Sequence, residues 1–245
     1  QIGFDPYADY RNASIGTSYV FYTNRKWLDR LVPNTYEFRR WNFDGDLKTQ
    51  QHFLGIDAET RVAQTNFGIG YSNQAEKFAG VEFNHLWRVN VYFNSTPFDW
   101  LSLYASASQG EGIARFAVEK GQETYINVGA TLKPMDQLNI QPYFDYAHSD
   151  DAETDAEFFK GYIARTRFQY QFNRELSARL VVQYDDFERR WEVDPLLTYR
   201  LSPFSVFYAG STYNYDELRA GPNDPRRWTL SSRQFFMKLQ YLFQS

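Results

Sequence analysis

Residues 233–243 alternate apolar and mostly polar side chains, and this alternation constrains the fold more than any other feature of the chain. One face of the segment would carry Phe235, Met237, Leu239, Tyr241 and Phe243. Successive side chains of a strand point to opposite faces, so such a segment has one apolar and one polar side. The mean hydropathy of the chain is nevertheless −0.60, which would suit a water-soluble protein. Both observations fit a transmembrane β-barrel, in which lipid-facing and lumen-facing residues alternate along every strand.

About thirteen segments of this kind can be marked along the chain. They span residues 15–23, 34–43, 47–56, 61–72, 85–94, 99–108, 123–132, 138–148, 158–172, 175–186, 189–201, 204–214 and 230–243. Many have the roughly 9–11 residues that a tilted strand needs to cross a bilayer. We therefore predict an all-β fold, an antiparallel transmembrane β-barrel of the outer-membrane type with about 12–14 strands in this chain. Residues 1–245 would form a single β-barrel domain.

The links between these segments carry a second signal. Short turns alternate with longer, polar links along the chain. The short turns lie near residues 57–60, 95–99, 133–137, 173–175 and 202–203. The longer links are residues 73–84, 109–122, 149–157 and 215–229, and link 186–189 is a short exception. Outer-membrane barrels have short periplasmic turns and longer extracellular loops. Asp44-Gly45-Asp46 predicts a tight hairpin turn, because Asp-Gly favours the positive φ angles of such turns. Bacterial barrels have an even strand number, so we expect at least one further strand upstream, in a larger barrel.

Composition narrows the function classes. Aromatic residues make up 19% of the chain, and Tyr and Trp suit membrane interfaces because one end of each ring is apolar. A net charge of −4 gives no basis for binding nucleic acid, which normally requires a basic surplus. Cysteine is absent, which excludes disulfide frameworks and cysteine-ligated metals. The sequence contains no run of about 18 apolar residues, so it predicts no transmembrane helix.

Several segments resemble one bacterial family. They are residues 1–4 (Gln-Ile-Gly-Phe), 183–186 (Gln-Tyr-Asp-Asp), 196–203 (Leu-Leu-Thr-Tyr-Arg-Leu-Ser-Pro) leading into Phe207-Tyr208, and the finish 235–243. The chain is similar to the C-terminal part of uncharacterised outer-membrane β-barrel proteins whose long members carry an N-terminal carbohydrate-binding domain of the family-nine type. The resemblance implies an outer-membrane barrel that is part of a longer protein, and it transfers no catalytic residue.

Charged residues alternate with the apolar ones and would face the barrel lumen. The candidates are Arg88, Arg165, Arg167, Arg179, Asp185, Arg190, Glu192, Asp194, Arg200 and Lys238. Basic and acidic groups facing each other across a lumen set a field that selects polar or anionic solutes. Alternatively, the charges pair with one another and fill a narrow interior, because arginine facing lipid at the midplane costs about 2–4 kcal/mol. Both interpretations stay open and are compatible.

The sequence offers little for catalysis or metal binding, and we predict no catalytic residue, metal or cofactor. His52, His85 and His148 lie far apart and in no metal-ligand spacing. Link 149–157 is rich in carboxylates that could gather Ca²⁺, but it lacks the glycine and terminal glutamate of an EF-hand, so a solvated loop is favoured. Most of the tryptophans lie near the predicted strand ends, which favours an interface girdle over sugar-stacking platforms.

These features lead to one prediction with three rivals. We predict a channel-like or transporter-like barrel of the bacterial outer membrane for polar solutes, which the resemblance suggests are glycan-derived. A closed barrel could instead anchor a periplasmic domain or scaffold a surface complex. A lipid or glycan hydrolase and a soluble β-sandwich are the less favoured alternatives. The expected partners are the bilayer with its lipopolysaccharide and, within a complex, other envelope proteins.

Overall fold

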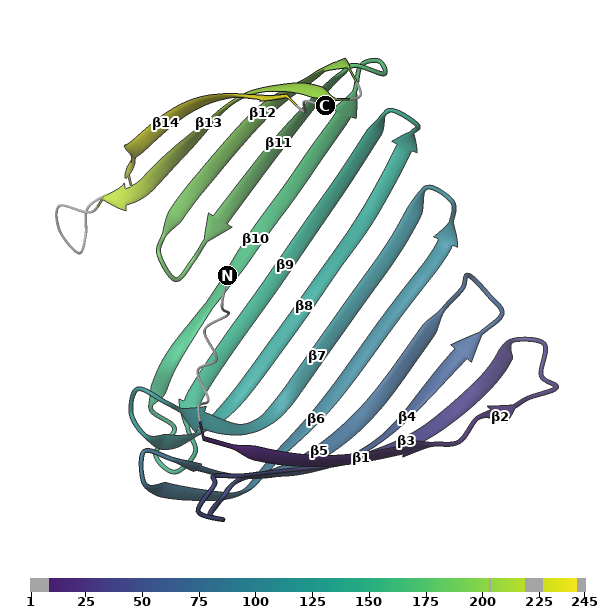
Figure 1. Cartoon of the computed structure of the whole chain (residues 1–245), viewed down its shortest axis with the longest axis vertical. Helices are drawn as coiled ribbons and strands as arrows, with labels where there is room; N and C mark the ends of the chain where they lie inside the picture. The colour runs from purple at the N-terminus through teal and green to yellow at the C-terminus, as the bar shows by residue number, and fades with distance from the viewer. Residues whose placement is uncertain (1–8, 203, 219–226, 242–245) are drawn as a thin grey trace. The chain divides into compact units, whose positions relative to one another are not determined.

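The computed structural model describes residues 9–202, 204–218 and 227–241, which form a single 14-stranded antiparallel sheet. Each long strand pairs with the next along the chain, so the sheet is a meander (Figure 1). The strands are β1 (Arg11–Ser18), β2 (Phe21–Tyr22), β3 (Leu28–Trp41), β4 (Leu47–Thr60), β5 (Asn66–Phe78), β6 (Val81–Phe98), β7 (Leu101–Ala114), β8 (Glu119–Met135), β9 (Leu138–Asp151), β10 (Glu157–Gln171), β11 (Leu176–Asp185), β12 (Arg190–Ser202), β13 (Ser205–Leu218) and β14 (Arg227–Tyr241). The short β2 pairs with β3 and lies off the main path. The all-β antiparallel prediction is confirmed.

Turn chemistry explains why the chain reverses where it does. Gly45 has a φ of 96°, and its N–H donates to the Asn42 carbonyl at 3.2 Å, which closes the predicted Asp-Gly-Asp turn between β3 and β4. Ala79 and Gly80 join β5 to β6 with φ values of 50° and 83°. Two consecutive positive φ angles are typical of a type I′ hairpin, whose twist matches that of the flanking strands.

The predicted contrast between short turns and long links is wrong for three of the links. Most of residues 73–84 and 109–122 continue the flanking strands, and so do residues 149–151 and 157 of the third link, which leaves turns of two to five residues. The reason is physical. Where both faces of a hairpin carry polar side chains, hydrophobic alternation disappears although the backbone ladder continues. The fourth link, 215–229, lies partly outside the described residues.

The sheet is not closed into a barrel in this structure. Its strand order begins at β1 and ends at β14, and these two strands do not pair within the described residues. The predicted barrel closure is therefore not seen.

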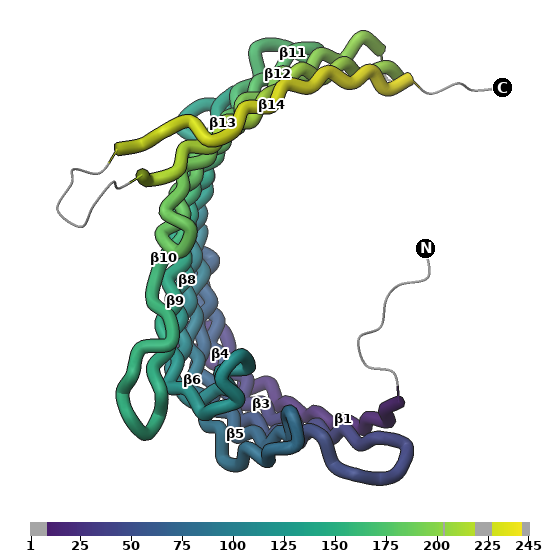
Figure 2. Tube along the Cα trace, turned by 90° about the vertical axis from the view of Figure 1, so that its left-hand side faces the viewer, coloured from purple at the N-terminus to yellow at the C-terminus, as the bar shows by residue number. Residues whose placement is uncertain are grey.

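The chain divides into two compact units. The first contains residues 1–97, 105–126 and 147–160, and the second contains 98–104, 127–146 and 161–245. In the second unit, β11 to β14 lie side by side (Figure 2). In the first unit, β4 and β5 pair in continuous register, and β3 pairs with β4 with register shifts near its two ends, between Leu28 and Arg30 and between Arg40 and Trp41.

Candidate functional site: an arginine cluster on the polar face

In the second unit, cross-strand register places the predicted lumen residues on one face. Arg165 lies opposite Gln183, which lies opposite Glu192, and residues directly opposite in a ladder share a face. The same pairing, followed through β10 to β14, puts these predicted residues on that face: Arg165, Arg167, Arg179, Asp185, Arg190, Glu192, Asp194, Arg200 and Lys238. We call it the polar face. Whether it faces a lumen stays a prediction.

Three of these residues, Arg165, Arg167 and Arg179, form what we call the arginine cluster. Arg165 and Arg167 are two residues apart on β10, and Arg179 lies on β11 opposite Gln169. None of the three forms an ion pair with a carboxylate in the described part of the chain. The Nε atoms of Arg167 and Arg179 are buried and have no hydrogen-bond partner among the described residues. Arg167 also donates a hydrogen bond from Nη2 to Gln169 Oε1 at 2.9 Å, which leaves its positive charge without an opposite charge.

A pocket of about 560 Å³ opens beside the cluster. Its polar lining includes Arg165, Arg167, Gln141, Tyr143, Gln183 and Thr131. Guanidinium, amide and hydroxyl groups provide several hydrogen-bond donors for an oxyanion. The pocket therefore combines the positive charge of Arg165 and Arg167 with room for a small polar solute.

The acidic residues of this face do not neutralise the cluster. Asp185 accepts hydrogen bonds from the backbone N–H groups of Phe187 and Glu188, at 2.9 and 3.1 Å. Glu192 accepts from Gln183 at 3.4 Å. One oxygen of Asp194 is buried without a partner among the described residues. The acids of β11 and β12 thus share the face with the cluster but lie beyond ion-pair distance of it.

Arg190 behaves differently from the cluster. Its Nε donates to Asp216 at 2.8 Å, and its Nη1 lies 2.6 Å from Glu188. These contacts fit the pairing interpretation. The predicted lumen residues therefore separate into a paired group and an unpaired one.

In the first unit, the predicted lumen residue Arg88 contacts both a carboxylate and an aromatic ring. It forms an ion pair with Glu123, whose side chain is only 11% exposed, and its guanidinium lies 5.5 Å from the centre of the Tyr125 ring. Two further pairs lie beside it, Arg115 with Glu76 at 2.8 Å and Lys120 with Glu111 at 3.1 Å. Arg88 therefore belongs to a network of paired charges.

Sequence reasoning missed a glycine–aromatic arrangement in the first unit. Phe53 lies over Gly55 and Gly70, and a Cβ at Gly70 would come within 2.5 Å of the ring. Tyr92 likewise covers Gly68 and donates a hydrogen bond to Asp57 at 2.7 Å. An aromatic ring over a strand glycine replaces the packing that the missing side chain would provide. The Gly-x-Gly pattern at residues 68–70 could have indicated this arrangement, because a strand glycine leaves room for a neighbouring ring.

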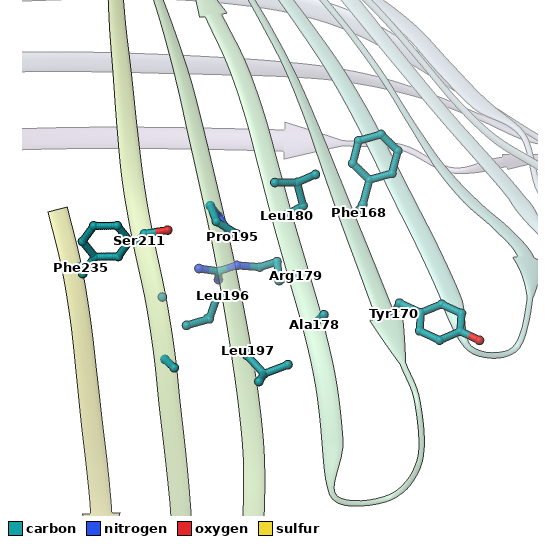
Figure 3. Close-up of a pocket in the computed structure, with 12 residues that line it drawn as sticks. Phe168, Tyr170, Ala178, Arg179, Leu180, Pro195, Leu196, Leu197, Ser211 and Phe235 are labelled. Atoms are coloured by element: carbon teal, nitrogen blue, oxygen red, sulfur yellow. The ribbon is translucent and has the colours of Figure 1, made fainter. Parts of the chain in front are cut away.

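The opposite face of the second unit is apolar and hollowed. Phe168, Tyr170 and Phe235 surround a groove of about 580 Å³, over the small residues Ala178 and Ser211 (Figure 3). Many large side chains of this face are exposed, among them Leu197 at 42% and Met237 at 79%. Such an extended apolar surface is unusual for a monomeric soluble protein.

Aromatic rings gather towards one end of that apolar face. The ring centres of Tyr184 and Trp191 are 5.0 Å apart, and Trp228 lies 5.9 Å from Tyr184. Trp100 stacks on Phe98 at 5.3 Å beside a turn of the same unit. Trp100, Trp191 and Trp228 thus lie near strand ends, where an interface girdle would place them, whereas Trp87 lies within β6.

Two histidines contact carboxylates. In the first unit, His52 Nδ1 lies 2.5 Å from Glu37, and His148 Nε2 lies 3.0 Å from Asp150. A histidine–carboxylate pair supplies no nucleophile by itself, so a hydrolase site here would need a further group. Next to His148, the backbone N–H groups of Thr154 and Glu153 donate to Asp151 at the turn and lower the pKa of that carboxyl.

Comparison with known protein families and with curated proteins gives no match for the chain. The family resemblance therefore stays a prediction. No helix within the described residues is long and apolar enough to span a membrane.

Proposed function

We propose that this chain is a membrane-spanning β-sheet of the outer-membrane barrel type, whose polar face gives polar and preferentially anionic solutes a path. The observation that carries the proposal is the arginine cluster, which lies on the face opposite an exposed apolar surface. Solutes would meet the guanidinium groups, and lipid would meet the apolar side chains.

Strand length and hydrophobicity support the membrane location. The shortest strand among β10 to β14 has 10 residues, and the longest have 15, which is enough to cross the hydrocarbon region at a tilt. Burying apolar surface in lipid contributes about 25 cal/mol per Å². Leaving Phe235, Met237 and Leu239 at 63, 79 and 63% exposure in water would forgo that gain.

A membrane location sets a condition on the sheet edges. Hydrocarbon offers no partner to unpaired backbone N–H and C=O groups, so β1 and β14 must both be paired there. The proposal therefore includes closure, either of the edges with each other or with additional strands.

The unpaired arginines support anion preference. Three like charges held near one another repel, and the repulsion is relieved when an anion accepts their hydrogen bonds. Rings of arginine and lysine are a known means of selecting anions in pores.

The paired charges of the first unit favour a second candidate, a non-conducting barrel that anchors or scaffolds other envelope proteins. Arg88, Arg115 and Lys120 each contact a carboxylate, which fits an interior filled by ion pairs. Such a barrel would still insert in a membrane but would pass no solute.

Planar-bilayer conductance of the reconstituted chain separates the two candidates. We expect anion-selective steps whose selectivity falls when Arg165→Gln and Arg167→Gln are combined. Arg174→Gln is the matched control, because Arg174 is exposed in the turn between β10 and β11 and its loss removes the same type of charge. Inserted protein without conductance would reject the solute path and favour the anchor, and unchanged selectivity in the double variant would reject the role of the cluster.

A further inference from the structure

We propose that His148, Asp150 and Glu157 form a binding site for a transition-metal ion of the Zn²⁺ class, which would connect β9 to β10. The inference is independent of the proposed solute path. It concerns the β9–β10 hairpin, which contains link 149–157, expected from the sequence to be a solvated loop.

The three ligand atoms already converge. His148 Nε2 lies 3.0 Å from Asp150 Oδ1 and 3.9 Å from Glu157 Oε2, and all three ligand atoms lie within 4.8 Å of one another. Tetrahedral zinc with ligand bonds of about 2.0–2.1 Å holds its ligand atoms roughly 3.4 Å apart. Small side-chain rotations are therefore enough to reach that geometry.

The backbone holds the ligands in place. His148 and Asp150 are two residues apart on β9, so their side chains project from one face, and Glu157 is the first residue of β10. The hairpin between them is closed by a hydrogen bond from the Asp151 N–H to the Ala156 carbonyl at 2.8 Å. Asp151 Oδ1 also accepts from the N–H of Thr154 at 2.7 Å. A preformed turn reduces the ordering cost of metal binding.

The donor types favour zinc over calcium. One imidazole nitrogen and two carboxylate oxygens suit Zn²⁺, and three protein ligands leave a fourth position for water. Ca²⁺ takes 6–8 oxygen ligands, which this set does not supply. Asp151, Glu153 and Asp155 add negative charge to the hairpin and favour a cation.

The alternative is that a protonated His148 simply forms ion pairs with the two carboxylates. That alternative needs a charged imidazole, whereas a metal needs the neutral ring and releases protons on binding. The two accounts therefore differ in Zn²⁺ affinity at pH 7.5.

Isothermal titration of the whole chain with ZnCl₂ at pH 7.5, after chelator treatment, tests the site. We expect one Zn²⁺ per chain and a rise in unfolding temperature with Zn²⁺ concentration. His148→Asn should weaken binding more than about 100-fold, beyond the roughly 10–100-fold that loss of an outer-shell partner costs. His85→Asn is the matched control, because His85 has a φ of 59°, which Asn tolerates, and it is not among the three ligands.

Glu157→Gln keeps the test decisive if His148→Asn does not fold. Glu157 is 58% exposed, so its replacement leaves packing intact, and it should also weaken Zn²⁺ binding. Absence of one-to-one Zn²⁺ binding would overturn the proposal. Equal affinity in the wild type and in Glu157→Gln, or binding of Ca²⁺ in preference to Zn²⁺, would overturn it as well.

Discussion

Replacing Leu197 with arginine should distinguish a lipid-facing surface from a water-facing one. Leu197 lies on the apolar face of β12, opposite Ala178 on β11 and Ala209 on β13. Both neighbours are too small to shield a guanidinium. The next residue, Thr198, lies on the polar face, opposite Ser177 and Tyr208, so Thr198→Arg is a matched control on the same strand.

The expected loss of stability in Leu197→Arg depends on how deep residue 197 lies in the membrane. Leu197 is five residues before the strand end at Ser202. At about 3.4 Å per residue and a tilt of about 40°, its Cα would lie roughly 13 Å inside that end. An arginine side chain cannot easily span this distance, so the cost should approach the 2–4 kcal/mol of a midplane arginine. In water, an exposed substitution of this kind changes stability by only about 0.5 kcal/mol.

Urea-dependent folding into lipid vesicles measures the free energy of unfolding of each variant. We predict a loss of about 2–4 kcal/mol for Leu197→Arg and under about 1 kcal/mol for Thr198→Arg. A Leu197→Arg variant as stable as the wild type, or a Thr198→Arg variant that is the less stable of the two, would refute the assignment of faces.

Two further substitutions test the packing of the first unit. Glu123→Gln leaves Arg88 without its carboxylate partner. Because the Arg88 side chain is 24% exposed, we expect the free energy of unfolding in urea to fall by about 2 kcal/mol, less than the 3–5 kcal/mol that breaking a fully buried pair costs. An unchanged free energy of unfolding would show that the pair does not stabilise the fold. Gly70→Ala should cost about 1–3 kcal/mol because its Cβ would meet the Phe53 ring at 2.5 Å, and Phe53→Ala should relieve that cost in the double variant. Gly16→Ala is the control, since its Cβ would have a nearest neighbour at 3.5 Å; equal costs at Gly70 and Gly16 would contradict the ring-over-glycine account.

Alternation predicted the second half of the sheet well because its two faces differ strongly in polarity. Phe168 and Leu180 face one side, and Arg167 and Arg179 the other, as the sequence of each strand indicated. A slip of one residue would exchange the faces, so the pattern also constrains the register. The predicted order of neighbouring strands follows from the short turns between them.

The sequence could not predict where strands end beyond the apolar region. Residues 119–122 and 149–151 belong to strands although their hydrophobic pattern resembles a loop. It also could not indicate which charges pair. Arg88 and Glu123 are 35 residues apart, and their contact depends on the arrangement of β6 and β8.

The proposed metal-binding triad shows the same limit at short range. His148, Asp150 and Glu157 follow no familiar motif, and only the hairpin brings Glu157 back to the histidine. The sequence favoured a solvated loop over a Ca²⁺ site for link 149–157, and the nitrogen ligand of the proposed site lies outside that link.

Cysteine scanning along β10 in reconstituted bilayers tests the central claim most directly. The chain has no cysteine, so each introduced thiol can be labelled alone with a polarity-sensitive fluorophore. Probes at Ala164, Thr166, Phe168 and Tyr170 should be quenched by lipid-attached quenchers, whereas probes at Arg165, Arg167 and Gln169 should be quenched by water-soluble iodide. The account predicts this two-residue period across the strand. Uniform access of iodide to all seven positions would contradict a membrane-spanning sheet.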